Sequence, residues 1–142
     1  MTQGYNFRDL GGYHTIDGKY IKWGKVFRSD DLHNLSPEDL HYLSEIPIVS
    51  IVDFRSEEEI NLQPDKNPIS TKENYKFSIT PGNLMDAVRN NMDKMTTEEI
   101  NSLMMDMNRL LVSDSSCVKQ YKKFFSLLQN EENTPLLFHC TA

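Results

Sequence analysis

The residues with the clearest chemical potential close the sequence, where a short apolar run leads into His139 and Cys140. The run, Leu136 to Phe138, has the length and composition of a buried strand. In open α/β sheets, ligands bind at the carboxyl ends of the strands, so a cysteine there is placed to act as a nucleophile. A tight loop after the strand could lower the thiol pKa and bind a tetrahedral oxyanion through its backbone N–H groups.

The alternative interpretation of Cys140 is an inert buried thiol, which is the commoner state of a free cysteine. The second cysteine, Cys117, lies near an expected helix start and is interpreted as inert. Two cysteines and four scattered histidines provide neither a disulfide framework nor the spacing of a metal site. We therefore expect no metal and no other cofactor.

Composition limits the classes of partner. The 142 residues carry a formal net charge of −6, which disfavours nucleic acid and anionic membrane surfaces. No apolar stretch approaches the ~20 residues of a membrane span, so no transmembrane segment is expected. The N-terminal residues have no apolar signal core, which favours the cytoplasm; a secreted or periplasmic location would require that a signal peptide had been removed.

The elements that must position Cys140 follow an alternating pattern. Ser36 and Pro37 mark a helix start, and the helix should end at Pro47 with Leu40, Leu43 and Ile46 on its buried face. Residues 48–54 form an apolar, β-branched strand typical of a sheet covered on both faces. A capping box at Ser56 begins a short helix that ends at Pro64. This order predicts an α/β fold with a parallel central sheet flanked by helices.

The remaining segments complete this pattern. Asp17-Gly18 predicts a hairpin between residues 13–16 and 19–23, and shorter strands are expected at 26–28 and 75–79. Residues 84–112 are rich in methionine and predict two helices, 84–93 and one that begins after Thr96. We interpret their methionine face as core filling, with a mobile helical lid as the alternative. A last helix is expected over 114–129.

Several motifs together carry a family resemblance. In chain order they are Asn6-Phe7-Arg8-Asp9-Leu10-Gly11-Gly12-Tyr13, Val26-Phe27-Arg28-Ser29, Ile51-Val52-Asp53-Phe54-Arg55-Ser56-x-x-Glu59 and His139-Cys140-Thr141-Ala142. This set resembles the bacterial and fungal tyrosine phosphatase-like family. The family belongs to the protein tyrosine phosphatase superfamily, whose signature loop is His-Cys-x-x-Gly-x-x-Arg. The resemblance implies a phosphatase-like α/β fold with a helical lid-type insert, which residues 84–112 would supply.

The resemblance also implies roles for individual residues. Cys140 would attack phosphorus and form a phosphocysteine. His139 would hold the loop and help to keep the thiolate stable, and Thr141 and Ala142 would begin the phosphate-binding arc. Asp53 would serve in proton transfer or in loop support, and the second role is favoured. Further support would come from ion pairing by Arg55 and Glu59, from a buttress formed by Asn6, Arg8 and Asp9, and from an ion-pair role for Arg28.

The family loop continues with a Gly, a Lys-Asp pair, an Arg and a helix, none of which occurs within these residues. We therefore expect residues 1–142 to be the N-terminal portion of a single phosphatase domain. Its partner would be the remaining C-terminal part of the same protein, and residues 1–142 alone should be inactive because the Arg clamps the phosphoryl oxygens.

The expected activity is hydrolysis of phosphomonoesters, with phosphate as a product. Substrates would be phosphotyrosine, another phosphorylated protein or a phospholipid headgroup such as a phosphoinositide. Two alternatives remain: a rhodanese-like sulfur transferase, which the Asn-Phe-Arg-Asp stretch disfavours, and a non-catalytic pseudophosphatase that binds without turnover.

Overall fold

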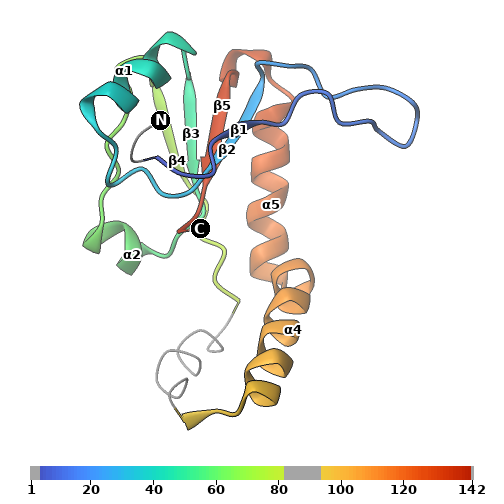
Figure 1. Ribbon diagram of the computed structural model, residues 1–142. Helices are drawn as coiled ribbons and strands as arrows, with labels where there is room; N and C mark the ends of the chain where they lie inside the picture. The colour runs from blue at the N-terminus through green and yellow to red at the C-terminus, as the bar shows by residue number, and fades with distance from the viewer. Residues whose placement is uncertain (1–3, 82–93, 142) are drawn as a thin grey trace.

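A five-stranded sheet organises the described part of the chain (Figure 1). The computed structural model describes residues 4–81 and 94–141. The strand order is β1-β2-β5-β3-β4, and all neighbours are parallel except β1, which runs antiparallel to β2. The strands are β1 (Arg8–Asp9), β2 (Val26–Ser29), β3 (Ser50–Asp53), β4 (Glu73–Lys76) and β5 (Leu136–His139). The expected parallel α/β architecture is confirmed.

The register of the parallel strands brings their carboxyl ends to one edge. β5 lies between β2 and β3, and His139 is paired with Ser29 on one side and with Asp53 on the other. All four residues of β3 are buried, as are three of the four in β5. Their apolar composition suits strands that are covered on both faces. Residues that follow these strands therefore meet at the middle of one sheet edge.

Two helices, α1 and α2, begin at well-formed N-terminal caps. The hydroxyl of Ser36 accepts a hydrogen bond from Asp39 N at the start of α1 (Pro37–Glu45). Ser56 and Glu59 form a capping box at the start of α2 (Glu57–Leu62). Both helix starts agree with the sequence prediction, because capping is a local interaction that the sequence specifies directly.

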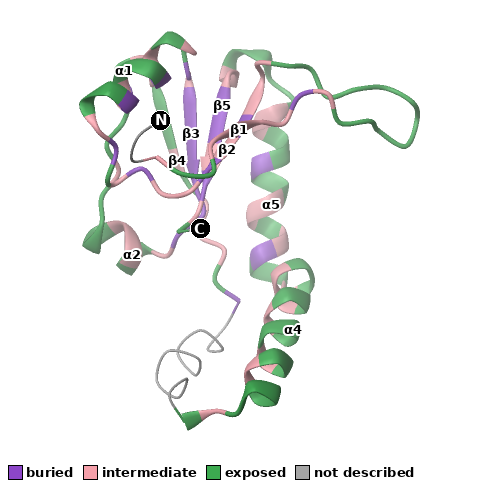
Figure 2. Ribbon diagram, viewed as in Figure 1, coloured by how far each residue is buried: buried purple, intermediate pink, exposed green. Residues whose placement is uncertain are grey.

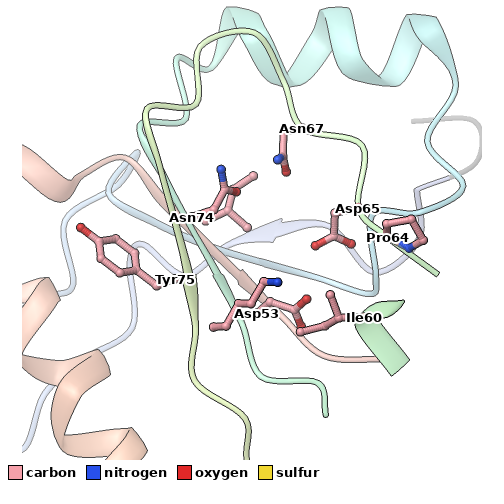
Figure 3. Close-up of a pocket in the computed structure, with 9 residues that line it drawn as sticks. Asp53, Ile60, Pro64, Asp65, Asn67, Asn74 and Tyr75 are labelled. Carbon is pink, nitrogen blue, oxygen red and sulfur yellow. The ribbon is translucent and has the colours of Figure 1, made fainter. Parts of the chain in front are cut away.

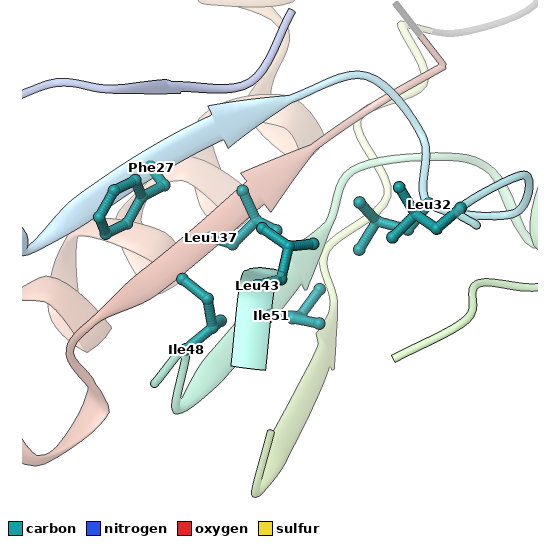
Figure 4. Close-up of a cluster of buried hydrophobic side chains, with 7 residues drawn as sticks. Phe27, Leu32, Leu43, Ile48, Ile51 and Leu137 are labelled. Carbon is teal, nitrogen blue, oxygen red and sulfur yellow. The ribbon is translucent and has the colours of Figure 1, made fainter. Parts of the chain in front are cut away.

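Hydrophobic clusters cover both faces of the sheet. Under α1, one cluster joins residues of β2, β3 and β5 to the helix (Figure 4): Phe27, Leu32, Leu35, Leu43, Ile48, Ile51 and Leu137. On the opposite face, Val52, Phe54 and Leu136 pack with Phe124 of α5 (Ser115–Leu128). Leu43 is fully buried, whereas Leu40 and Ile46 are only partly buried against the first cluster.

The described part of the methionine-rich segment does not fill the core. The helix α4 (Thr97–Ser113) has no buried residue, and Figure 2 shows only exposed and intermediate positions along it. Met104 and Met105 are 42% and 56% exposed, so the core-filling interpretation is wrong for them. The reason is that α4 meets one end of α5 and extends away from the sheet (Figure 1). The predicted helix 84–93 lies outside the described residues.

Two predicted strand positions need correction. The strand expected at 75–79 is observed as Glu73–Lys76, because its register with Ser50–Asp53 of β3 sets its limits. The hairpin around Asp17-Gly18 is present as a projecting arm (Figure 1), but it forms one isolated bridge, His14 to Tyr20, instead of two strands. Its residues are mostly exposed, so no second layer stabilises a regular ladder.

The Gly-Gly pair at the base of this arm has a steric role. A Cβ atom on Gly12 would lie 2.5 Å from Cζ2 of Trp23, and one on Gly11 would lie 2.5 Å from Trp23 Cα. Gly12 also has a positive φ of 83°. The Trp23 indole can therefore lie against this backbone only because both side chains are absent.

The last helices agree with the prediction. Asp114 caps α5 by accepting hydrogen bonds from Ser116 N and Cys117 N, and a 3₁₀ helix, η2 (Glu131–Asn133), leads into β5. Cys117 is fully buried, and burial raises the pKa of its thiol, as expected for an inert cysteine. Within residues 4–81 and 94–141, no helix is both long and apolar enough to cross a membrane.

Candidate active site

Cys140 directly follows the central strand β5, at the edge where the parallel strands end. Its side chain is half-buried and lines a pocket of about 300 Å³. The other lining residues are Arg28, Phe54, Ile79, Leu111, Tyr121, Phe138 and His139. The wall is thus mainly aromatic and aliphatic, with Arg28 as its permanent cation. The placement of Cys140 predicted from the sequence agrees with this geometry.

The described surroundings do not activate the thiol. Burial raises the pKa of Cys140, and the carboxylates of Glu59 and Asp53 raise it further, while hydrogen bonding by Thr141 opposes them. A thiolate here therefore needs positive charge or additional N–H donors.

A buried ion network lies beside the cysteine. Arg55 has a side chain only 1% exposed, and its guanidinium lies between two carboxylates. Nε and Nη2 donate to Asp53 at 3.0 and 2.7 Å, Nη2 also donates to Asp65 at 2.7 Å, and Nη1 donates to the Gln63 carbonyl at 2.9 Å. Burial alone would lower the pKa of Arg55, but the hydrogen bond with Asp53 and the charge of Asp65 raise it overall. The ion-pairing role expected for Arg55 is therefore observed.

Asp53 is occupied by this pairing. Its Oδ1 accepts from both the backbone N and the Nε of Arg55, and its Oδ2 accepts from Nη2. A carboxylate held by several donors is poorly placed to deliver a proton. Of the two roles considered for Asp53, this geometry favours loop support.

His139 lies at the end of β5 within the same network. Its Nε2 is 2.9 Å from Asp65 Oδ2, although the contact is not aligned as a hydrogen bond. Its Nδ1 is 3.3 Å from the Cys140 carbonyl oxygen and 4.0 Å from Asp53 Oδ1. His139 thus connects the buried network to the backbone of the cysteine loop.

Asp65 is the residue that the sequence interpretation missed. Residues 64–74 have the polar composition of a surface loop, yet Asp65 contacts Arg55 and His139 in the buried network. It also lines a second pocket, of about 230 Å³, together with Asp53 and Asn74 (Figure 3). The sequence held only an indirect signal for Asp65. A buried Arg55 would need acidic partners, and Asp65, directly after Pro64, was one candidate.

One donor atom each of Asp53, Asp65 and His139 lie within 4.8 Å of one another, close enough to hold a metal ion. However, the Arg55 guanidinium already pairs with both carboxylates. A second cation would have to displace it, so the arrangement fits an internal ion network better than a metal centre.

Glu59 supports the loop through hydrogen bonds. Its Oε2 accepts from the backbone N and the hydroxyl of Ser56, and its Oε1 accepts from the Thr141 hydroxyl at 2.9 Å. The carboxylate therefore links the start of α2 to the residue after the cysteine. Ala142 lies outside the described residues.

The N-terminal motif residues serve the projecting arm and its base. Asp9 accepts hydrogen bonds from Gly11 N at 2.8 Å and from Gly24 N at 2.7 Å, and Arg8 donates to the Asn6 carbonyl at 3.1 Å. Strand β2 separates β1 from β5. The contacts seen for these residues are thus local, and a direct buttress of the cysteine loop stays a prediction.

The chain has a mostly parallel sheet, and a cysteine follows its central strand beside a buried ion network. This arrangement is a phosphatase-like α/β fold. The chain belongs to the tyrosine phosphatase family, whose sequence model matches residues 1–142. It is also similar to a protein of Cupriavidus necator named "Putative tyrosine-protein phosphatase", with 26% identity over 144 residues. The match covers 96% of this chain and 49% of that protein, so the chain spans about half the length of this relative. The family resemblance inferred from the motifs is confirmed.

Proposed function

We propose that the protein containing this chain is a cysteine-dependent phosphatase that hydrolyses phosphomonoesters. The observation that carries the proposal is the position of Cys140 after β5, at the carboxyl edge of the sheet and in the wall of a pocket. Membership of the tyrosine phosphatase family supports the same chemistry.

In the proposed reaction, the Cys140 thiolate attacks phosphorus, an S–P bond forms and the ester P–O bond breaks. The leaving oxygen takes a proton from a general acid. Water then attacks phosphorus, the S–P bond breaks, and inorganic phosphate and the free thiolate are released. This route requires no metal, and the C-terminal part of the protein would supply the remaining donors to the phosphoryl oxygens.

The pocket suggests what the ester group is. Phe54, Tyr121 and Phe138 form an aromatic wall beside Cys140, and Arg28 adds a positive charge. An aryl ring would lie against this wall while its phosphate approaches the thiol. Phosphotyrosine in a protein is therefore the favoured substrate, with other phosphoproteins and phospholipid headgroups as further candidates.

The test is hydrolysis of p-nitrophenyl phosphate by the full-length protein in the presence of a chelator. We expect turnover that is lost in Cys140→Ser and retained in Cys117→Ser, together with a phosphoenzyme trapped by acid quench on the Cys140 peptide. Activity that survives Cys140→Ser, or that depends on added metal, would contradict the proposal. Binding of the aryl phosphate without turnover would instead indicate a non-catalytic module.

A further inference from the structure

The projecting arm, residues 13–25, presents uncovered apolar side chains to solvent. Five large hydrophobic residues in this short segment are exposed: Tyr13, Ile16, Tyr20, Ile21 and Trp23. Figure 1 shows the arm extending away from the sheet, and Figure 2 shows exposed positions along most of it. Apolar side chains that gather on one exposed segment indicate a surface that meets a partner.

The exposed side chains follow a gradient from the tip of the arm to its base. Ile16 lies beside the Asp17-Gly18 turn at the tip and is fully exposed. Midway along the arm, the ring of Tyr20 lies against His14, with 4.2 Å between the ring centroids. Trp23 lies at the base and is 70% exposed. At a lipid surface, aliphatic groups prefer the acyl chains and aromatic rings prefer the headgroup level, so the arm matches the polarity profile of such a surface.

The charge of the arm is opposite to that of the rest of the chain. Residues 13–25 contain three lysines (Lys19, Lys22 and Lys25) and one acid, Asp17, which gives a formal charge of +2. Because the whole chain carries −6, the other residues carry −8. Lys22 contacts Glu131 at 3.5 Å, yet its side chain stays 75% exposed. An anionic surface would therefore attract the arm and repel the remainder, which orients the arm toward the surface.

We propose that the projecting arm docks the protein onto a lipid surface that contains anionic phospholipids. Ile16 enters the acyl boundary, Trp23 and Tyr20 lie at the headgroup level, and the lysines contact the lipid phosphates. The expectation against anionic membranes follows from the total charge of the chain and does not include this separation of charge. The proposal is independent of the phosphatase reaction.

A lipid surface fits the arm better than an acidic protein does. Both would attract the lysines, but a protein interface also needs a complementary shape and pockets for its buried apolar residues. Here the apolar groups are spread from Ile16 at the tip to Trp23 at the base of a hairpin that stands away from the sheet. A fluid lipid surface adapts to that shape without preformed pockets.

The test is sedimentation of the full-length protein with phosphatidylcholine vesicles that either contain or lack phosphatidylserine. We expect binding to the anionic vesicles, weaker at high salt. Ile16→Ser should weaken this binding about tenfold, whereas the matched control Ile69→Ser, at a residue that is 95% exposed outside the arm, should not change it. Lys22→Gln should weaken it about fivefold, and Lys119→Gln, at an exposed lysine of α5, should have less effect.

A second measurement locates the contact. The fluorescence of Trp23, isolated as the difference between the unmutated protein and Trp23→Phe, should shift to shorter wavelength when anionic vesicles are added. An unshifted Trp23 spectrum in vesicle-bound protein would refute the proposal, as would equal binding of Ile16→Ser and Ile69→Ser. A full-length protein that does not sediment with anionic vesicles would also refute it, and an arm covered by another protein or by the C-terminal part would give that result. Because the assay needs no turnover, none of these outcomes bears on the proposed phosphatase function.

Discussion

Removal of the Arg55 guanidinium tests whether the buried ion network stabilises the fold. Arg55→Met keeps most of the side-chain volume but leaves Asp53 and Asp65 without their shared cation. Breaking a buried pair by removing one partner typically costs about 3–5 kcal/mol. Because Arg55 also donates to the Gln63 carbonyl, we expect a loss in this range in the free energy of unfolding.

Urea denaturation, with the midpoint and slope compared between variants, measures this loss. The matched control is Arg109→Met, which removes an exposed pair with Asp106 on α4, where the side chains are 73% and 55% exposed. That change should alter stability by less than about 0.5 kcal/mol. If Arg55→Met costs no more than Arg109→Met, the network does not stabilise the fold and the reasoning fails.

The pH dependence provides a second check on the same variant. The pKa of Asp65 is lowered in the folded state from 3.8, so its stabilising contribution is present above that pH and is lost as the pH falls through the folded value. In Arg55→Met, Asp65 loses one of the charges that lower its pKa. The difference in stability between the variant and the unmutated protein should therefore shrink below about pH 4.

Two further predictions use internal controls. Gly12→Ala should destabilise the protein by at least about 2 kcal/mol, because the new Cβ would clash with Trp23 and the residue has a positive φ. Gly18→Ala also has a positive φ but open space around it, so it should cost only about 1 kcal/mol. Equal losses in thermal unfolding would show that the Trp23 indole is not the reason for glycine at position 12. Glu59→Gln and Glu99→Gln should each weaken one capping box by up to about 1 kcal/mol. Only the Glu59 variant should lower the pKa of the Cys140 thiol and speed its alkylation, and equal rates in both variants would contradict this.

Sequence signals were reliable where the interaction is local. The caps at Ser36, Ser56 and Thr96 each involve a residue three positions on, so the helix starts could be predicted from a few letters. The buried strand before Cys140 was likewise evident from its unbroken apolar run. These signals were sufficient to predict the α/β class and the position of the cysteine at a strand end.

Predictions failed where distant segments decide the outcome. The limits of β4 depend on its register with β3, and the methionines of α4 are exposed because that helix extends away from the sheet. The sequence of each segment alone does not specify these outcomes, because an apolar periodicity shows that one face is apolar without showing what packs against it.

The same distinction applies to the candidate active site. The sequence by itself determined the nucleophile candidate, the strand that presents it and the family motifs around it. Only the tertiary structure brought Asp65 from a polar loop to Arg55 and His139, because parallel strands with crossover connections join residues that are remote along the chain. The buried ion network beside Cys140 is thus a property of the folded sheet edge, where removing one partner of a buried pair is costly.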